Sequence, residues 1–497
     1  MEELGFPAWI RATHLLNIVF MSFLIRSGIQ ILASHPKLYW NDDCRHGSEW
    51  ARFTKKEMPQ DKLWTSEDEE EEYPSTIAMP GGSLLGLGRQ WHFFNVVFWI
   101  LTGVVYVALL FIDWPQWTRL IPTSWDVIPG AWNSLVTYLS FDLPPIPPGE
   151  EYNPLQKLAY GAVVFLLAPF QIATGAAMSP ALSARFPWYI KLFGGHQSAR
   201  SLHFLGILAW VGFIIVHLFM VVVHGFGKET AKMVFGTEEH AEAAIVITIV
   251  SLIALVALHI LTTQLTLKYP RRAQHALLSV VSPVRRALFR RLTSAQDYPV
   301  SEISPQPRVN GRPPAGETYK GMAENDFKDW RLEVYGLVEK PRSFSLEELR
   351  TFPTKQTQTT LHHCIQGWSY VAEWGGVPLR QILDLVKPLP DARYLVFRTL
   401  ENVPESEPDP KGPGNFYGTI DFELAKHPQT ILAYEMNGEP LPVVHGAPLR
   451  LRVETQLGFK MVKYLCAIEV VETYQHIGKG QGGWREDNQY YGTGAGI

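Results

Sequence analysis

Five long apolar runs constrain the fold of this chain more than any other feature of its sequence. They occupy residues 13–33, 92–112, 158–178, 203–224 and 243–265. Each is about 20 residues long, the length that an α-helix needs to cross the hydrocarbon core of a bilayer. We therefore expect a membrane α-helical bundle of five transmembrane helices. Five crossings would place the two ends of the chain on opposite sides of the membrane.

The residues beyond the last run follow a different pattern. Residues 331–335 alternate between apolar and polar side chains, as in a strand, and Ser345 with Glu348 fits a helix capping box. Further strand-like stretches are separated by Pro and Gly turns and lie at 394–397, 449–453 and 467–471. This pattern predicts a mixed α+β domain.

Composition and pattern together divide the chain into three parts. They are a membrane domain over 1–266, a linker over 267–300 and the α+β domain over 301–497. The linker is basic and amphipathic, with Arg271, Arg285 and Arg290 among its cations, so we expect it to lie on anionic membrane lipid.

The distribution of charge predicts the orientation of the chain. Lys and Arg gather in the segments that share a side with the C-terminal domain, and the positive-inside rule then places that domain in the cytoplasm. No export signal with twin arginines precedes the first run, which is read as a span and not as a signal peptide. The net charge of -4 gives no electrostatic reason to expect nucleic-acid binding. The loop over 34–91, with its acidic run at 67–72, is expected to be a solvated insertion without chemistry.

Four histidines have positions that suit axial haem ligands. His203 and His217 lie on the fourth span, 14 residues apart, which puts them about 21 Å apart on nearly one face of the helix. By topology His14 shares a depth with His217, and His92 shares a depth with His203. Ionisable groups inside spans are costly and are usually functional, so two bis-histidine haem sites are predicted.

Three other polar residues in these segments leave alternatives open. His224, seven residues after His217 on the same face, is a rival ligand to His217. His259 has no identifiable partner at its depth. Arg26 could pair with a haem propionate or extend toward the interface.

Thiol chemistry can involve only three cysteines, Cys44, Cys364 and Cys466. They form no CxxC pair for zinc or an iron–sulfur cluster. Cys44 and Cys466 fit buried core thiols. Cys364 stands in Leu361–Ser369 (LHHCIQGWS), where flanking histidines and backbone amides could lower its pKa and make it a thiolate ligand for a thiophilic metal.

The membrane part resembles a known family of haem proteins. The segments Arg11–His14 and Gly88–His92 and the spacing of His203 and His217 are similar to the cytochrome b subunits of formate dehydrogenase, nickel–iron hydrogenase and thiosulfate reductase. The resemblance covers most of residues 8–225. It implies two haem b groups and electron exchange between a quinone pool and an attached redox domain.

The C-terminal part resembles the sulfite oxidase superfamily, on the side of its bacterial methionine-sulfoxide-reductase branch. The segments that carry the resemblance are 361–369, 433–441, 445–450 and 458–463. It implies a sulfite-oxidase-type fold in which Cys364 is the catalytic residue and ligates the molybdenum of a molybdenum–molybdopterin cofactor. The residues that it implies for binding the pterin and its phosphate are Asn310, Thr399, His445, Arg450, Met461, Val462 and Lys463. The planar fork of Arg450, the charge of Lys463 and the hydroxyl of Thr399 suit that role.

Two departures from the family narrow the expected activity. Sulfite oxidases follow their cysteine with arginines that help to bind an oxyanion, and here the stretch is Ile365–Ser369, which disfavours sulfite. The sulfoxide-reductase branch is usually a separate exported enzyme, and here the two parts are fused.

The resulting hypothesis is a membrane-bound molybdopterin-dependent oxidoreductase. It would pass electrons between quinone and molybdenum through two haems, with the haem of His92 and His203 nearer to molybdenum. It would reduce an oxo or sulfoxide-type small molecule that the sequence does not identify. The alternatives are a dehydrogenase that reduces quinone, a haem conduit with a docking domain, and a membrane-anchored binding or assembly protein without a working cofactor.

Overall fold

The structure is a computed structural model of the whole chain and describes residues 6–59, 61–148, 150–289, 296–404 and 413–492. It contains two compact units. The first consists of Met1–Ile29, Gln90–Ala176 and Arg200–Ala273, and the second of Gln30–Arg89, Ala177–Ala199 and Gln274–Ile497. The domain boundaries expected at residues 266 and 300 were inferred from composition and pattern, and they remain a prediction.

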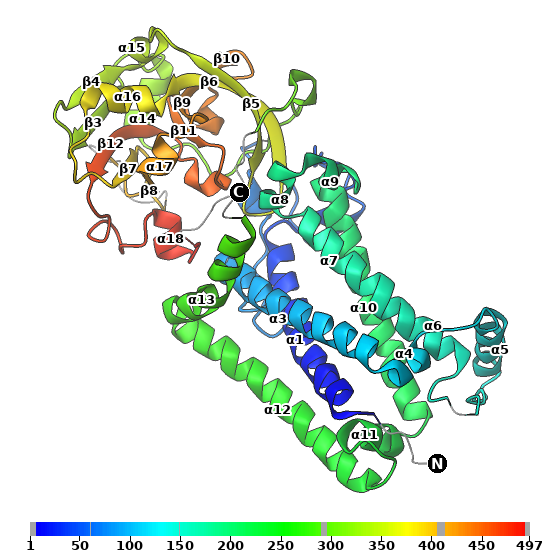
Figure 1. Cartoon of the computed structure of the whole chain (residues 1–497). Coiled ribbons are helices and arrows are strands. Elements are labelled where there is room, and N and C mark those ends of the chain that lie inside the picture. Colours follow the sequence, from blue (N-terminus) through cyan, green and yellow to red (C-terminus); the bar gives the residue numbers. More distant parts are fainter. Residues whose placement is uncertain (1–5, 60, 149, 290–295, 405–412, 493–497) are drawn as a thin grey trace. The chain divides into compact units, whose positions relative to one another are not determined.

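Five helices in the described residues are long and apolar enough to cross a membrane, which confirms the expected spans. Four of them are the single helices α1 (Ala8–Ala33), α3 (Leu85–Ile112), α10 (His196–Val223) and α12 (Ala241–Lys268). The third span along the chain is continuous but consists of α6 (Pro154–Ala162), the π-helical η1 (Val163–Leu167) and α7 (Ala168–Ala177). Their shorter neighbours are α4 (Trp114–Leu120), α5 (Val127–Leu139) and α11 (Phe226–Val234). Figure 1 shows α1, α3, α10 and α12 as the long rods of the bundle.

Several of these helices begin earlier than the apolar runs do. Helix α3 starts at Leu85 and α10 at His196, each seven residues before the expected start. The difference arises because hydropathy marks the lipid-facing part of a helix, whereas the hydrogen-bonded ladder continues through polar first turns. At the start of α6 the Oδ1 of Asn153 accepts a hydrogen bond from the backbone N–H of Gln156 at 3.0 Å. This capping bond, with Pro154 in the first turn, fixes where the third span begins.

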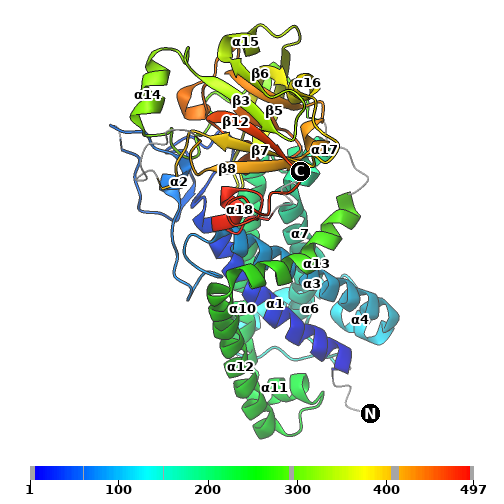
Figure 2. The same cartoon turned by 90° about the vertical axis from the view of Figure 1, so that its left-hand side faces the viewer.

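The second unit is built around two five-stranded sheets. One has the order β10-β9-β6-β5, with β11 also paired to β9, and the other has the order β4-β3-β12-β7-β8. Figure 2 shows β3, β12, β7 and β8 side by side in that order. The strands of the first sheet are β5 (Gln356–His363), β6 (Ser369–Pro378), β9 (Thr430–Met436), β10 (Glu439–Pro440) and β11 (Arg450–Val453). Those of the second are β3 (Arg331–Gly336), β4 (Arg342–Ser345), β7 (Tyr394–Thr399), β8 (Tyr417–Asp421) and β12 (Leu465–Val471). A short pair is formed by β1 (Lys37–Leu38) and β2 (Ala51–Arg52).

Helices and turns complete the second unit. The α-helices are α2 (Ser66–Glu69), α8 (Pro180–Arg185), α9 (Pro187–Lys191), α14 (Glu317–Glu324), α15 (Leu346–Arg350), α16 (Leu379–Val386), α17 (Phe422–Ala425) and α18 (Trp484–Asn488). The 3-10 turns are η2 (Val300–Glu302), η3 (Val443–His445) and η4 (Gly458–Lys460). Helix α13 (Pro270–Phe289) forms most of the predicted linker and runs from the first unit into the second.

Local sequence signals account for much of this α+β architecture. The predicted capping box starts α15, since the Ser345 Oγ accepts from the Glu348 N–H at 3.1 Å and the Glu348 carboxylate accepts from the Ser345 N–H at 2.6 Å. In β3 the alternation buries Leu332 and Val334 and exposes their neighbours. Strands β5 and β6 pair antiparallel through the register His363↔Ser369, so the chain between them makes a tight turn. Cys364 opens that turn.

The loop after the first span is not the solvated insertion that we expected. Residues 30–89 belong to the second unit, and Glu69 in the acidic run is only 1% exposed. Its carboxylate accepts from the Lys37 Nζ at 3.2 Å and from the Arg308 Nη2 at 2.6 Å. Burial alone would raise the pKa of Glu69, but Arg308 and Lys37 hold it below its usual value. The expectation was wrong because Arg308 lies more than two hundred residues away in the sequence.

Replacement of Glu69 by Gln tests this packing. The variant would leave Lys37 and Arg308 buried without their counter-ion, at a cost of about 3–5 kcal/mol. We expect the apparent unfolding temperature of the detergent-solubilised protein, followed by tryptophan fluorescence, to fall by about 10 °C. Glu72→Gln changes an exposed carboxylate of the same run and should have little effect. Equal unfolding temperatures for the two variants would mean that the run is solvated after all.

Candidate functional site

Cys364 sits in the buried turn that joins β5 to β6. Its backbone N–H donates to the Trp368 carbonyl at 3.0 Å and its carbonyl accepts from the Gly367 N–H at 3.2 Å. Gly367 has a φ of +103°, a conformation that favours glycine. The Cys364 Sγ is 3.7 Å from the Asn310 Nδ2 and 3.4 Å from the Gln366 Oε1. The thiol, although part of the buried core, therefore contacts polar side chains.

Three donors hold the carbonyls of residues 365–367, which follow Cys364 in this turn. The Arg89 Nη1 donates to the first at 3.4 Å, the Ser34 Oγ to the second at 3.1 Å and the Gln197 Nε2 to the third at 2.9 Å. Ser34 follows α1, whereas Arg89 and Gln197 belong to α3 and α10. All three donors lie in parts of the chain that pack within the second unit.

The flanking histidines do not activate the Cys364 thiol, contrary to the sequence-based expectation. Burial raises its pKa to about 12. Burial also holds the pKa of His362 and of His363 well below the usual histidine value, so both rings are neutral. His362 accepts a hydrogen bond from Arg452 at its Nδ1, and the ring of His363 packs edge-on against His196. A bound metal cation would favour the thiolate form of this residue.

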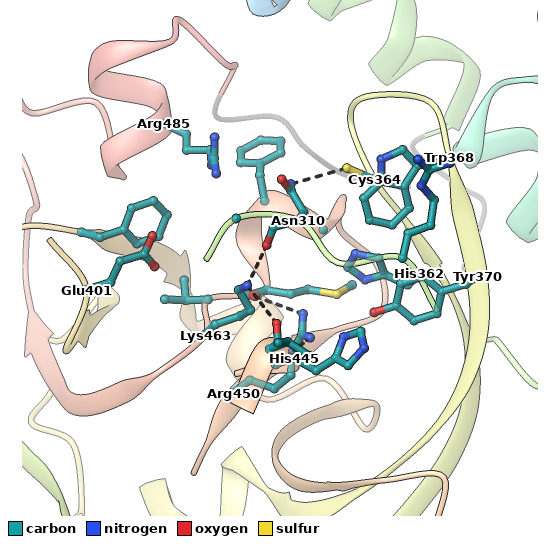
Figure 3. A pocket seen from close by; sticks show the side chains of 18 residues that line it. Asn310, His362, Cys364, Trp368, Tyr370, Glu401, His445, Arg450, Lys463 and Arg485 are labelled. Atoms are coloured by element: carbon teal, nitrogen blue, oxygen red, sulfur yellow. Dashed lines mark hydrogen bonds between the residues drawn. The ribbon is translucent and has the colours of Figure 1, made fainter. Parts of the chain in front are cut away.

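A pocket brings most of the predicted cofactor-binding residues together (Figure 3). Its lining includes seven of them, which are Asn310, Cys364, His445, Arg450, Met461, Val462 and Lys463. They come from the segment before α14, from the β5–β6 turn, from η3 and β11, and from the segment after η4. Figure 3 shows Asn310 between Cys364 and Lys463, and the Lys463 Nζ donates to the Asn310 carbonyl at 2.7 Å.

Arg450 and Lys463 give the pocket its positive charge. The Arg450 Nη1 donates to the His445 carbonyl at 2.8 Å, and the Lys463 Nζ also lies 3.3 Å from the Val444 carbonyl. Neither cation forms a salt bridge with a carboxylate in the part of the chain that the structure describes. Burial lowers the pKa of Arg450 to about 10 and that of Lys463 to about 8. Both groups would be stabilised by an anion in the pocket.

The donor set fits a phosphorylated pterin. The Arg450 Nε and the Asn310 Oδ1 are buried and have no hydrogen-bond partner among the described residues. Burial lowers the pKa of His445 to about 3, so its neutral ring can donate and accept hydrogen bonds. Gly446 has a φ of +115°, and a Cβ there would lie 2.9 Å from the Cβ of Lys463. The glycine thus lets the His445 and Lys463 segments approach each other.

Thr399 is not brought to the pocket with the other predicted residues. Its hydroxyl donates to the Phe416 carbonyl at 3.1 Å and accepts from the Glu401 N–H at 3.0 Å. The side chain is fully buried. Two residues further on, Glu401 does line the pocket.

The sequence-based reasoning missed the residues that surround Cys364 from other segments. The Gln366 Oε1 accepts from the Trp368 indole N–H at 2.8 Å, and its Nε2 donates to the Glu70 carboxylate. Burial raises the pKa of Glu70 to about 7. Arg485, from α18, also lines the pocket. No local motif indicates the contact of Gln366 with Glu70, because it joins residues 296 positions apart.

In the first unit the rings of His14 and His217 face each other. Their centroids are 6.3 Å apart, with an angle of 58° between the planes. An iron between two imidazole nitrogens, with metal–nitrogen bonds of about 2 Å, would separate the ring centres by about 6 Å. This geometry fits one bis-histidine haem site.

His92 and His203 are each oriented by a hydroxyl group. The His92 Nδ1 lies 3.1 Å from the Ser27 Oγ, and the His203 Nδ1 lies 3.1 Å from the Thr174 Oγ1. Hydrogen bonds of this kind at one ring nitrogen are typical of metal-bound histidines. The His203 Nε2 lies 3.0 Å from the Gln171 Nε2, a contact that an iron ligand bond would replace.

The remaining polar residues of the spans have other partners. The His224 Nε2 lies 3.2 Å from the Tyr138 hydroxyl and its Nδ1 lies 2.9 Å from the Met220 carbonyl, so both ring nitrogens are in use. His259, for which the sequence showed no partner, lies 2.9 Å from the Ser22 Oγ and 2.8 Å from the Arg26 Nη1. Arg26 therefore interacts with another span.

Family models match both parts of the chain. Residues 5–236 match the prokaryotic cytochrome b561 family, and residues 319–477 match the oxidoreductase molybdopterin binding domain. The first match includes α1, α3, α10 and the third span. The second includes Cys364, Arg450 and Lys463, whereas Asn310 lies before it.

Known proteins resemble parts of this chain. A YedZ1 protein of Azospira oryzae, named as a subunit of protein-methionine-sulfoxide reductase, is 35% identical over 196 residues, which cover 39% of this chain and 64% of that protein. The protein-methionine-sulfoxide reductase catalytic subunit MsrP of Xanthomonas campestris is 37% identical over 151 residues, 29% of this chain and 45% of that one. The sulfane dehydrogenase SoxCD of Paracoccus pantotrophus matches with a TM-score of 0.26 and 25% identity, over 32% of this chain and 45% of that chain, and supports no conclusion about fold.

The matches thus span less than two thirds of the length of each of these relatives. Together the two family models cover the first four spans, up to residue 236, and the core of the α+β domain. The chain thus joins a region that matches the prokaryotic cytochrome b561 family to a region that matches the oxidoreductase molybdopterin binding domain.

Proposed function

We propose that this protein is a quinol-dependent, membrane-bound molybdenum enzyme that reduces a sulfoxide-type substrate, with two b-type haems carrying electrons between quinol and the molybdenum cofactor. The convergence of Cys364, Asn310, His445, Arg450 and Lys463 on one pocket carries the proposal. These residues come from segments spread over 154 positions of the sequence, from 310 to 463.

Each residue of the pocket has a proposed role in holding the cofactor. Cys364 supplies the thiolate that ligates molybdenum, and molybdenum supplies two-electron oxygen-atom transfer when bound. Arg450 and Lys463 bind the pterin phosphate, because their charges lack a carboxylate partner among the described residues.

The other predicted residues complete the pocket. Asn310 and His445 hydrogen-bond the pterin, and Met461 with Val462 form an apolar wall. Thr399 supports the site from outside the pocket by fixing the turn that presents Glu401.

The haem ligands are proposed from the geometry of the spans. His14 and His217 form one bis-histidine site, which the 6.3 Å separation of their rings supports. His92 and His203 form the second, supported by the hydroxyl groups that orient both rings. The excess of Lys and Arg on one side of the spans places the C-terminal domain in the cytoplasm.

The substrate class rests on the relatives and on the chemistry of the pocket. Two relatives are named as parts of methionine-sulfoxide reductases. Reduction of a sulfoxide takes two electrons and two protons and releases a sulfide and water. The neutral pocket histidines and the buried Glu70, with its pKa near 7, keep exchangeable protons near the metal ligand.

The haem assignment predicts different effects for two neighbouring histidines. His217→Ala should lose one of the two haems, since it removes an axial ligand that faces His14. His224→Ala should retain both, because His224 is hydrogen-bonded to Tyr138 and to the backbone. The pyridine haemochrome assay on the purified variants measures the content per chain. Loss of haem from the His224 variant alone would reverse the assignment.

If electrons pass through the haems, the effect of a haem-ligand mutation on the reduction rate should depend on which electron donor is supplied. His203→Ala should lower methionine-sulfoxide reduction by decylubiquinol at least a hundredfold, because the electron path through its haem is interrupted. Reduction by a viologen, which can donate directly to the molybdenum domain, should remain within about threefold of wild type. The molybdenum content serves as the control for intact folding of the C-terminal domain. Equal rates of quinol oxidation in variant and wild type would contradict the proposal.

A further inference from the structure

Four consecutive carboxylates of the first inter-span loop each contact a different residue around the pocket. Glu67 pairs with Arg485 at 2.6 Å, Asp68 with Arg312 at 2.6 Å and Glu69 with Arg308 at 2.6 Å. The fourth carboxylate, of Glu70, accepts from the Gln366 amide. We call residues 67–70 the acidic segment. It is held in place by the Ser66 N–H, which donates to the Val309 carbonyl at 2.9 Å.

Two of these arginines belong to the pocket itself. Arg308 and Arg485 line it together with Cys364. Although burial alone would raise the pKa of Glu67, Arg485 holds it below its usual value, so the pair is ionised. The Glu67 side chain is 39% exposed and that of Arg485 17%, which leaves this pair accessible from solvent.

The cations of the pocket thus fall into two classes. In the part of the chain that the structure describes, Arg450 and Lys463 donate to carbonyl groups and form no salt bridge, whereas Arg308 pairs with Glu69 and Arg485 pairs with Glu67. In Figure 3 the Arg485 guanidinium and the Cys364 sulfur lie toward one end of the pocket, and Arg450 with His445 toward the other. One end can therefore attract a phosphate, and the end near the metal ligand is neutralised.

A guanidinium fork is the usual partner of an oxyanion in proteins. An oxyanion that enters the pocket near Cys364 would have to displace a carboxylate from Arg485 or approach the carboxylates themselves. An uncharged substrate that supplies an oxygen atom is not repelled by these carboxylates. We propose that the acidic segment is a specificity filter, which excludes oxyanions from the molybdenum site and admits uncharged oxo compounds.

This inference rests on the proposed function and makes its substrate class more specific. It predicts uncharged sulfoxides and amine N-oxides as substrates, whereas tetrahedral or planar oxyanions should not be reduced and should inhibit the wild-type enzyme only weakly. Glu67 is the best residue at which to test the inference, because its partner Arg485 lines the pocket and both side chains are partly exposed to solvent.

The test uses the full-length holoenzyme and sulfate as an inert dianion. The inhibition constant of sulfate against dimethyl sulfoxide, with a viologen reduced electrochemically as donor, is compared at constant ionic strength for wild type and Glu67→Gln. We expect Glu67→Gln to bind sulfate about tenfold more tightly, with a change of less than twofold in the KM for dimethyl sulfoxide. The double variant Glu67→Gln/Arg485→Gln should return sulfate inhibition to the wild-type level.

Glu469→Gln is the matched control, since Glu469 pairs with Arg398 at 2.5 Å away from the pocket lining. It should leave sulfate binding unchanged. An unaltered inhibition constant in Glu67→Gln, or tight sulfate binding that persists in the double variant, would overturn the filter.

A second measurement separates this inference from the proposed function. Sulfate should raise the apparent unfolding temperature of Glu67→Gln and leave that of wild type and of the double variant unchanged, whether or not a sulfoxide is turned over. Absence of sulfoxide reduction with this thermal response intact would reject the proposed activity alone. An identical response to sulfate in all variants would reject the filter alone.

Discussion

The organisation of the second unit depends on which donors hydrogen-bond the backbone carbonyls of the turn that carries Cys364. The carbonyls of residues 365–367 lie outside the β5–β6 register, and buried carbonyls without partners are costly. Ser34, Arg89 and Gln197 supply the missing donors. The turn that carries Cys364 therefore relies on segments that lie outside residues 319–477, next to membrane spans in the sequence.

This dependence gives a physical reason for the fusion of the two family domains in one chain. The inter-span loop also supplies the carboxylates that neutralise Arg308 and Arg485 and the group that orients Gln366. A separate molybdopterin domain would have to provide these contacts from its own sequence. Here the loop between the first two spans both supports the turn that carries Cys364 and sets the charge around it, while Arg450 and Lys463 form no salt bridge among the described residues.

Periodicity and resemblance predicted the parts of the molecule that depend on local sequence. The five spans, the capping box at Ser345 and the strands of the α+β domain follow from hydropathy, capping chemistry and alternation. The residues that the family motifs indicated for cofactor binding lie together in one pocket, apart from Thr399, whose hydroxyl bonds the backbone instead.

The contacts that the sequence did not reveal are long-range and electrostatic. From the sequence alone, Glu69 is expected to be a solvated residue of an acidic run, whereas in the structure Arg308 donates a hydrogen bond to its carboxylate. The expectation of an activated Cys364 thiol failed because burial of the turn outweighs any effect of its neutral histidines. The partners of His259, in α12, are Ser22 and Arg26 of α1, and only the packing of the two helices reveals them. In each case the deciding quantity is burial or a distant charge, which no local motif records.

The content of molybdenum and b-type haem per purified chain, measured for wild type and for Cys364→Ala, tests the central claim most directly. We expect one molybdenum and two haems in wild type, with loss of molybdenum and retention of both haems in the variant. Two haems without molybdenum in the wild-type protein would contradict it, and would leave a cytochrome b that carries a non-catalytic domain.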